Sequence, residues 1–464
     1  MVLKFVDRET ELASLAEAHA SAKPEFFLIY GRRRIGKTEL VKRFASDKRH
    51  FYFLAKEQAI EVEVERLGEK FSEKFNVHIE RTGDLEKLFE QILKNIDPDE
   101  KFVVVIDEFP FWVSKQRKVL SDIQSLWDEL LRERNLFLIL LGSSVSMMEH
   151  EVMAYRSPLY GRRTGQLRIE PMRPKHLKEF LPRYSWEDLI KVFGAAGGVP
   201  FYLKEFTDGR SFQENIEKTF FNKSNILYEE AEVLLREALR EVHVYFNIMK
   251  AITDGATRMS EIAQKSRVDT TNINKYLSVL MSLGFVSKRH SITEPPKLKN
   301  MRYGIEDNYF RFWIRYVYPH KEEIEEDPAT MLKIFERDHP AYMGGIFEDF
   351  CSKMMRELDL PVVNEPGTLV GKWWHKGNEI DVAAINEDRK ELLLAECKWK
   401  GQVDGQELFE RLENKSELVD WHKGSRKVRL AVFAKSFRIR PESENVHAFD
   451  LHDIERALGR RKSG

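Results

Sequence analysis

The residues with the clearest chemical capacity form a glycine-rich loop near the start of the chain. An apolar run at residues 26–30 leads into Gly-x-x-x-x-Gly-Lys-Thr between Gly31 and Thr38, and a helical pattern follows from Leu40. Glycines at the two fixed positions let backbone N–H groups turn around a phosphate chain, and a helix that begins there points its positive end at the same place. The spacing therefore predicts a phosphate-binding loop.

The individual residues of this loop suit a nucleoside triphosphate with Mg2+. Lys37 would contact the β- and γ-phosphates, and the hydroxyl of Thr38 would bind Mg2+. The alternative is a strand-to-helix turn that binds nothing, and it is disfavoured because every fixed position of the motif is present. The predicted phosphate-binding residues are Gly31, Arg32, Arg33, Arg34, Ile35, Gly36, Lys37, Thr38 and Glu39.

A second stretch supports the first. Residues 101–106 have the β-branched, apolar character of a buried strand, and they end in Asp107 and Glu108. In an enzyme with a phosphate-binding loop, the first acid holds Mg2+ through water and the second polarises the attacking water. A solvated strand end is the alternative. Together with the loop, the pattern favours Asp107 as a metal ligand and Glu108 as a catalytic residue.

These side chains need a parallel sheet to position them. Strands predicted at residues 26–30, 51–54, 102–106 and 136–141 alternate with helical segments, which is typical of an α/β fold with a helix-covered parallel sheet. Ligands of such sheets bind at the carboxyl ends of the strands. Ser143 and Ser144 follow the last strand, where a polar residue either senses the γ-phosphate or the attacking water, or caps a helix.

The composition limits the class of protein. A length of 464 residues predicts about three domains. Charged residues make up 33%, as in thermophile proteins rich in ion pairs, and the net charge of −1 confines any nucleic-acid surface to a local patch. Two cysteines exclude a disulfide framework and indicate the cytoplasm. No apolar stretch approaches the ~20 residues of a membrane span, and a homo-oligomer is an open option.

Two further segments follow the predicted sheet. Arg162 and Arg163 lie in a loop flanked by glycines, where guanidinium groups could stabilise charge on a transferring phosphoryl group. A basic surface loop is the alternative for these arginines. Residues 175–245 have a helical pattern that contains Gly198-Val-Pro200, and a Gly-x-Pro turn can simply separate helices.

In combination, these motifs resemble the archaeal ATPase family, whose members are signalling-type (STAND), AAA+-related P-loop ATPases. The motifs are the Phe-Val-Asp-Arg-Glu box at 5–9, the loop at 31–38, Val-Ile-Asp-Glu at 105–108, Gly-Ser-Ser at 142–144 and Gly-x-Pro at 198–200. The resemblance covers about residues 1–240. It implies an ASCE-type ATPase core with a helical lid, ATP and Mg2+ as cofactors, Ser143 as sensor and Pro200 near the base. It does not select an arginine finger.

Residues 245–303 change character. Predicted helices at 259–264 and 269–280, followed by a turn into a strand at 284–289, are typical of a winged helix-turn-helix. Nine Lys or Arg residues stand against three Asp or Glu between 255 and 303, so this segment could meet DNA phosphates. Packing against its own ATPase core is the alternative. The candidate DNA contacts are Thr270, Thr271, Asn272, Asn274, Lys275, Lys288 and Arg289.

An aromatic run with interleaved arginines follows at residues 309–316. Such a run can stack nucleic-acid bases. At helical spacing it more often packs between domains, and packing is the favoured interpretation.

The last domain contains a second group of ionisable residues. A helix is predicted to begin at Gly345, and strands at 378–385 and 392–399 would form a hairpin that places Asp381 opposite a position within one residue of Glu396. Lys398 lies two residues beyond Glu396, on the same face of its strand. Two carboxylates and an ammonium would then converge, which is enough to bind Mg2+ and stabilise a phosphorane-like transition state. A charged hairpin face is the alternative.

This pattern resembles the PD-(D/E)XK nuclease superfamily, and also the nuclease-like C-terminal domain often attached to archaeal ATPases. The resemblance implies a restriction-endonuclease-like α/β fold with Glu348 as the helical acid, Asp381 and Glu396 as metal ligands, and Lys398 beside the attacking water. The expected segments are 1–172 (ATPase core), 173–244 (helical lid), 245–303 (winged helix-turn-helix), 304–339 (aromatic linker helices) and 340–464 (nuclease-like domain).

The function expected from the whole chain is an ATP-hydrolysing switch that gates a DNA-directed, Mg2+-dependent nuclease domain. An ATP-regulated nucleic-acid-binding or signalling scaffold with an inactive nuclease-like domain is one alternative. A peptide- or protein-handling ATPase is another, and the aromatic run at 309–316 is its main support.

Overall fold

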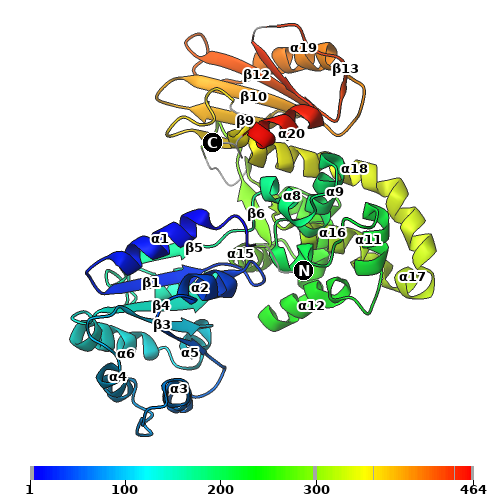
Figure 1. Ribbon diagram of the computed structural model, residues 1–464. Helices are drawn as coiled ribbons and strands as arrows, with labels where there is room; N and C mark the ends of the chain where they lie inside the picture. The colour runs from blue at the N-terminus through cyan, green and yellow to red at the C-terminus, as the bar shows by residue number, and fades with distance from the viewer. Residues whose placement is uncertain (1–4, 296–299, 359, 444, 461–464) are drawn as a thin grey trace. The chain divides into compact units, whose positions relative to one another are not determined.

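The computed structural model of the protein describes residues 5–295, 300–358, 360–443 and 445–460. It divides into two compact units, Met1–Met172 and Arg173–Gly464 (Figure 1). Lys297 and Lys299, two of the basic residues of the predicted winged helix, lie outside the described residues. Within the described ranges, no helix has both the length and the apolar character that crossing a membrane requires.

The first unit is built on a five-stranded parallel sheet with the strand order β2-β3-β4-β1-β5. The four strands predicted from the sequence are confirmed. Because β4 lies between β1 and β3, the strand that carries the acids is one strand removed from the strand that leads into the loop. The strands are β1 (Glu25–Tyr30), β2 (His50–Leu54), β3 (Phe102–Asp107), β4 (Leu136–Gly142) and β5 (Gly165–Arg168).

Helices cover both faces of this sheet, and the alternation of apolar residues along the strands explains why. Phe27 and Ile29 of β1 face the core under α1 (Glu9–Ala20) and α2 (Lys37–Ala45), whereas Phe26 and Leu28 face the opposite core. In Figure 1, α1 and α2 lie on one side of the strands and the other helices on the other side. Those helices are α3 (Ile60–Phe75), α4 (Leu85–Lys94), α5 (Pro110–Lys115) and α6 (Val119–Ser125).

The second unit begins with a group of helices, as the sequence predicts for residues 175–245. They are α8 (Leu177–Phe180), α9 (Trp186–Ala196), α10 (Pro200–Leu203), α11 (Phe212–Thr219) and α12 (Ile226–Ala238).

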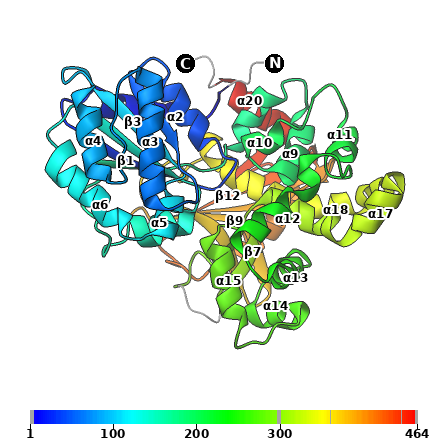
Figure 2. The ribbon, with the colours of Figure 1, turned by 90° about the horizontal axis from the view of Figure 1, so that it is seen from below.

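A winged helix follows. It comprises α13 (Val242–Thr253), α14 (Met259–Ser266), α15 (Ile273–Ser282) and the antiparallel pair β6 (Val286–Arg289) and β7 (Arg302–Ile305). Figure 2 shows α13, α14 and α15 gathered beside β7. The helix predicted from residue 269 begins at Ile273 instead, because the preceding residues form a turn in which the Asn272 N–H donates to the Asp269 carbonyl oxygen at 2.9 Å.

The aromatic run forms α16 (Asn308–Tyr316), and its rings are buried. The hydroxyl of Tyr309 donates to the Leu227 carbonyl oxygen at 3.0 Å, and the indole N–H of Trp313 donates to the Tyr228 carbonyl oxygen at 2.7 Å. This helix is therefore a packing element of the second unit, which confirms the favoured interpretation. Buried rings do not offer a base-stacking surface.

The helix predicted to begin at Gly345 actually begins 17 residues earlier, as α18 (Pro328–Met354), after the short α17 (Lys321–Glu326). It runs through residues 339 and 340, where the sequence predicts a domain boundary. Pro340 and the glycines at 344 and 345 weaken an isolated helix. Burial of Met343, Ile346 and Phe347 offsets that cost, because tertiary packing supplies most of the stability of such a helix.

The C-terminal part of the second unit is a mixed five-stranded sheet of order β14-β12-β10-β9-β8. The predicted hairpin is confirmed, since β9 runs antiparallel to β10 and to β8, while β12 and β14 run parallel to β10. Leu408 and Leu412 of α19 (Gly405–Ser416) pack on the sheet, and Phe347 of α18 contacts Trp399. The strands are β8 (Leu369–His375), β9 (Asn378–Asn386), β10 (Glu391–Lys398), β12 (Lys427–Ala434) and β14 (Val446–Phe449).

Three short elements complete this part. The strands β11 (Val403–Asp404) and β13 (Phe437–Ile439) pair with each other, and α20 (Leu451–Arg460) follows β14.

Candidate functional site

The glycine-rich loop of the first unit has a backbone that only glycine accommodates at its two ends. Gly31 and Gly36 have φ angles of +153° and +95°. A Cβ atom on Gly31 would lie 2.3 Å from the Ile169 carbonyl oxygen, so a side chain there would displace the backbone. Because α2 starts at Lys37 directly after Gly36, the first N–H groups of this helix face the loop, as an anion-binding site requires.

Lys37 reaches back across the loop. Its Nζ donates to the carbonyl oxygens of Gly31 and Arg32, both at 2.8 Å. Burial lowers the pKa of Lys37 to about 8, although the charges of Glu108 and Asp107 act in the opposite direction. The ammonium is thus held where a phosphate oxygen could replace a carbonyl oxygen as its acceptor.

The two predicted Mg2+ ligands are brought together. The hydroxyl of Thr38, in the first turn of α2, donates to Oδ2 of Asp107 at 2.7 Å, and Asp107 is buried at the end of β3. The hydroxyl of Tyr52 donates to the same oxygen at 2.6 Å, and the backbone N–H of Glu108 donates to Oδ1 at 2.8 Å. A hydroxyl and a carboxylate in contact are the hard oxygen donors that Mg2+ prefers.

Sequence reasoning missed Tyr52. Tyr52 lies within the predicted strand at 51–54, where an aromatic residue has no distinctive spacing signal. Only the pairing of β2 with β3, which sets Tyr52 opposite Val105, shows that its hydroxyl reaches the acid.

Glu108 is positioned by Ser143. The Ser143 hydroxyl, just beyond β4, donates to Oε2 of Glu108 at 2.6 Å, and Glu108 has a φ of +55°, in the left-handed region. A side chain in that region marks a position that the surrounding structure imposes. Ser144 takes the other role considered above, because its side chain caps α7 (Val145–Met147) by accepting the N–H of Met147.

Arg8, in the box at residues 5–9, forms a hydrogen bond with the backbone of the glycine-rich loop. Its buried guanidinium donates to the carbonyl oxygen of Ile35 at 3.2 Å and to that of Glu170 at 2.7 Å. The box was recognised as a motif in the sequence, but its contact with the loop becomes evident only in the structure.

Arg162 and Arg163 lie away from the loop of their own unit. They precede β5, which pairs in parallel with β1, and the Thr164 N–H donates to the carbonyl oxygen of Phe26 at 2.9 Å, at the start of β1. The loop follows the other end of β1. Arg162 forms an ion pair with Asp128 at 2.7 Å. These positions argue against either residue as a finger for its own loop, because parallel strands place the residues before β5 at the opposite edge of the sheet.

Pro200, predicted near the nucleotide base, is the first residue of α10 in the second unit. Its part in a nucleotide site stays a prediction.

The second unit brings together the predicted nuclease residues. In the β9–β10 pairing Val382 lies opposite Ala395, so the next pair in this register is Asp381 and Glu396. The Nζ of Lys398 lies 2.9 Å from Glu396 and 3.8 Å from Asp381. Burial, followed by the charges of Glu348 and Glu396, raises the pKa of Asp381 to about 7. Glu348 on α18 therefore acts electrostatically on the same group.

Two lysines that sequence reasoning missed complete this cluster. Lys415 of α19 lies 3.0 Å and 3.1 Å from the two carboxylate oxygens of Glu396, and Lys372 of β8 forms an ion pair with Glu348. Lysines are so frequent in this chain that no spacing signal distinguishes these two. In the part of the chain that the structure describes, no three His, Cys, Asp or Glu side chains form a group that could hold a metal ion.

The winged helix meets the C-terminal sheet through its wing. The N–H of Ile292 donates to the Lys372 carbonyl oxygen at 2.9 Å, and the N–H of Trp374 donates to the Ser291 hydroxyl at 3.2 Å. Arg289 forms an ion pair with Glu306 at 2.8 Å. The wing thus has a packing role in its own unit, in addition to any part in DNA binding.

The remaining candidate DNA contacts lie at two places. Lys288 lies on β6, where its Nζ is 6.0 Å from the centre of the Tyr303 ring. The others are exposed around the start of α15: Thr270, Thr271, Asn272, Asn274 and Lys275.

The sheet order, the glycine-rich loop after β1 and the acids at the end of β3 define the first unit as a P-loop ATPase fold. Residues 5–206 match a family described as an ATPase domain predominantly from Archaea, and residues 313–410 match a family described as Archaea bacterial proteins of unknown function. The chain belongs to the archaeal ATPase family.

Individual relatives extend this result. The uncharacterized protein MJECL04 of Methanocaldococcus jannaschii is 35% identical over 456 residues, which cover 97% of this chain and 100% of that protein. The uncharacterized ATP-binding protein MJ0423 of the same organism is 40% identical over 48 residues, or 10% of this chain and 81% of that protein.

Among solved structures, the Walker-type ATPase PABY2304 of Pyrococcus abyssi is similar with a TM-score of 0.51 and 21% identity. The match covers 67% of this chain and 96% of that chain. At this level of identity, the similarity concerns the fold.

Proposed function

We propose that the first unit binds ATP with Mg2+ and hydrolyses the γ-phosphate. The observation that carries this proposal is the contact between Thr38 and Asp107, which joins the predicted Mg2+ ligands of α2 and β3 at 2.7 Å beside the loop. The similarity to an ATP-binding protein, MJ0423, supports the choice of nucleotide. When bound, Mg2+ would neutralise charge on the β- and γ-phosphate oxygens.

Different residues of the first unit would bind the phosphates, hold the metal and orient the attacking water. Loop N–H groups and Lys37 bind and orient the phosphates, and Thr38 and Asp107 would hold the metal. Glu108 accepts a hydrogen bond from the attacking water and orients it toward the γ-phosphorus. Ser143 holds one oxygen of that carboxylate, so the other oxygen is left to contact the water.

The test separates binding from hydrolysis. Glu108→Gln should retain ATP affinity within about threefold, while hydrolysis falls on the order of a hundredfold or more, because the amide orients the water poorly and accepts no proton. Glu133→Gln, an exposed acid of the same unit, is the matched control. Parental hydrolysis by Glu108→Gln would refute the assignment.

We further propose that the C-terminal sheet is a Mg2+-dependent, DNA-directed nuclease whose activity the ATPase unit gates. The convergence of Asp381, Glu396 and Lys398 supports this second function. Asp381 and Glu396 would hold the metal, Lys398 would orient the attacking water, and Glu348 would act as the helical acid. The exposed residues around the start of α15 are the proposed DNA contacts of the winged helix.

Cleavage of DNA with Mg2+, measured with and without ATP, tests this half. Asp381→Ala should abolish cleavage and leave ATP hydrolysis unchanged, and the exposed Asp388→Ala should leave both unchanged. If the parent cleaves no DNA in any nucleotide state but binds it with steep salt dependence, the scaffold alternative replaces the nuclease.

A further inference from the structure

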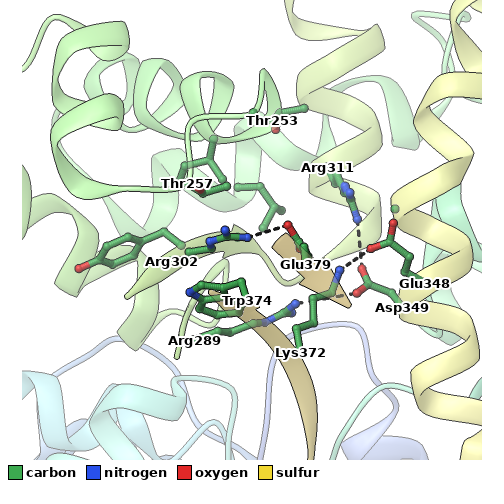
Figure 3. A pocket seen from close by; sticks show the side chains of 16 residues that line it. Thr253, Thr257, Arg289, Arg302, Arg311, Glu348, Asp349, Lys372, Trp374 and Glu379 are labelled. Atoms are coloured by element: carbon green, nitrogen blue, oxygen red, sulfur yellow. Dashed lines mark hydrogen bonds and ion pairs between the residues drawn. The ribbon is translucent and has the colours of Figure 1, made fainter. Parts of the chain in front are cut away.

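A pocket of about 250 Å3 lies within the second unit, where the winged helix, α16, α18 and the strands β8 and β9 meet. Figure 3 shows charged side chains from each of these elements directed into it. Of its lining residues, Arg289 and Glu348 are site candidates predicted from the sequence. Its cationic residues are Arg289, Arg302, Arg311 and Lys372, and its acidic residues are Glu348, Asp349 and Glu379.

The cations of the pocket are held in place by ion pairs. Arg311 lies 3.1 Å from Asp349, Arg302 lies 2.9 Å from Glu379, and Lys372 pairs with Glu348. Each pair uses only part of the five-donor guanidinium of an arginine or of the three donors of a lysine. The fourth cation, Arg289, is paired with Glu306 at 2.8 Å, so the charges of the lining balance, and the donors that these pairs leave unused are available for an anionic ligand.

The position of Arg311 depends on Gly345. A Cβ atom on Gly345 would lie 2.5 Å from Nη2 of Arg311, so the guanidinium rests against the backbone of α18 at a point where any side chain would displace it. Gly345 weakens the helix, but its missing side chain lets the Arg311 guanidinium approach the helix backbone. The absence of a side chain at residue 345 thus leaves room for one guanidinium against α18.

An aromatic wall completes the pocket. The half-buried Trp374 of β8 carries the guanidinium of Arg302 over its ring, at 4.4 Å from the ring centre, and Tyr303 also lines the cavity. Aromatic faces next to arginines bind nucleobases by stacking while the cations meet phosphate. Ligand pockets usually exceed roughly 300 Å3, so this smaller volume limits the occupant to no more than one nucleotide unit.

We propose that this pocket binds one phosphorylated nucleoside unit, with its phosphate on Arg311 and Lys372 and its base against the stacked pair of Arg302 and Trp374. Glu348 lines the pocket and also acts on Asp381, so the bound unit would lie beside the acid cluster. Because the pocket lies beside that cluster, we expect the bound nucleoside unit to be the end of a DNA strand. This choice of ligand rests on the proposed nuclease function. A free nucleotide has the same chemistry.

Binding is measured without divalent cations, so that no cleavage occurs, in the full chain carrying Lys37→Ala to disable the ATP loop. The probes are a 5′-phosphorylated single-stranded DNA dodecamer with a 3′ fluorophore, followed by anisotropy, and dAMP, followed by calorimetry. Trp374→Ala and Arg311→Ala should each weaken the probe that binds by roughly tenfold. Arg411→Ala, an exposed arginine of α19, should change affinity less than about twofold.

The dependence on salt distinguishes the two contacts. Arg311→Ala should flatten the plot of log affinity against log salt for the dodecamer, because a phosphate contact is lost, whereas Trp374→Ala should keep the parental slope. Binding of the dodecamer assigns the site to a strand end, and binding of dAMP alone assigns it to a free nucleotide. Parental affinity in both variants, or no binding of either probe to the parent, would overturn the proposal.

The outcome is separable from that of the nuclease proposal. A parent that binds the dodecamer through Trp374 and Arg311 but cleaves nothing with Mg2+ would refute the nuclease and keep the pocket. A parent that cleaves DNA while both variants bind and cleave like the parent would keep the nuclease and refute the pocket.

Discussion

The two candidate sites hold their carboxylates in different ways. In the first unit, the carboxylates of Asp107 and Glu108 accept hydrogen bonds from the hydroxyls of Thr38, Tyr52 and Ser143. In the second unit, Glu396 is bound by Lys398 and Lys415, and Glu348 by Lys372. One site is organised by neutral donors and the other by cations.

This difference bears on how readily each site accepts a metal ion. A hydroxyl can turn and become a ligand itself, since its oxygen both donates and accepts. An ammonium has no lone pair, so it must leave a carboxylate before a cation can approach that carboxylate closely. If Mg2+ binds as proposed, the first site takes it up without breaking an ion pair, whereas the second must break ion pairs first.

The largest expected effect tests the first site. Lys37→Ala should lower ATP hydrolysis on the order of a hundredfold or more, because the loop loses the charge that stabilises the transferring phosphoryl group. Arg43→Ala, an exposed cation of the same helix, is the control in a steady-state phosphate-release assay. Equal losses in both variants would mean that general charge, and not the loop, determines the rate.

A pH-dependent effect is expected in the second unit. Burial against Phe212, Phe335 and Tyr342, with a smaller contribution from the charge of Lys191, lowers the pKa of His339 to about 4. Between pH 6.5 and pH 4 the unfolded chain therefore binds a proton that the folded chain does not. The free energy of unfolding should fall by about 2 kcal/mol as the pH is lowered through this range.

The comparison is made by guanidinium unfolding at pH 7 and pH 4.5. His339→Phe should reduce the loss of stability between these pH values by about the contribution of His339, because carboxyls such as Glu187 and Glu232 contribute as well, while the exposed His452→Phe should retain the parental loss. If both variants lose stability with acid as the parent does, other groups control the acid response of the second unit.

A smaller loss of ATP hydrolysis is expected when Ser143, the residue whose hydroxyl donates to Glu108, is replaced. Ser143→Ala should lower ATP hydrolysis about tenfold with little change in ATP affinity, since the carboxylate loses the contact that orients it. Ser144→Ala removes only a helix cap and is the matched neighbour. A faster Ser143→Ala enzyme would show instead that the serine restrains Glu108.

The smallest effect tests the cationic restraint of the second site. Lys415→Met, in an Asp107→Asn background that lacks the first metal site, should bind Mg2+ about fivefold more tightly, because a partly buried ion pair of ~1 kcal/mol no longer competes. Calorimetric titration measures this, with the exposed Lys423→Met as control. Unchanged Mg2+ affinity would remove Lys415 from the competition, and the contrast between the two sites would then rest on Lys398.

Local patterns predict how the residues of the first candidate site are arranged. The strands, the loop and the acids of the first unit follow from short apolar runs and fixed spacings, because each strand of a parallel sheet is buried on both faces and ends at the ligand-binding edge. Asp381, Glu396 and Lys398 lie close in sequence on one hairpin, so their convergence could also be predicted.

Long-range contacts could not be predicted in the same way. Lys372 and Lys415 come from other elements, and one charged residue in three leaves no signal for which of them will meet. The start of α18 was misplaced because Pro340 and Gly345 are unfavourable in an isolated helix, whereas burial of the neighbouring apolar residues in the folded unit compensates for this. The contact of Tyr52 with Asp107 follows only from the pairing of β2 with β3.

The contact between the wing and β8 also covers part of a sheet edge. The strand β8 is the outer strand of its sheet, and the N–H of Ile292 occupies the Lys372 carbonyl oxygen on that edge. Outer strands with free backbone groups are templates for pairing with other chains. If the wing moved away from β8, the backbone groups of that edge would be free to pair with a strand of another molecule. Pairing between molecules through β8 would then compete with the return of the wing to β8.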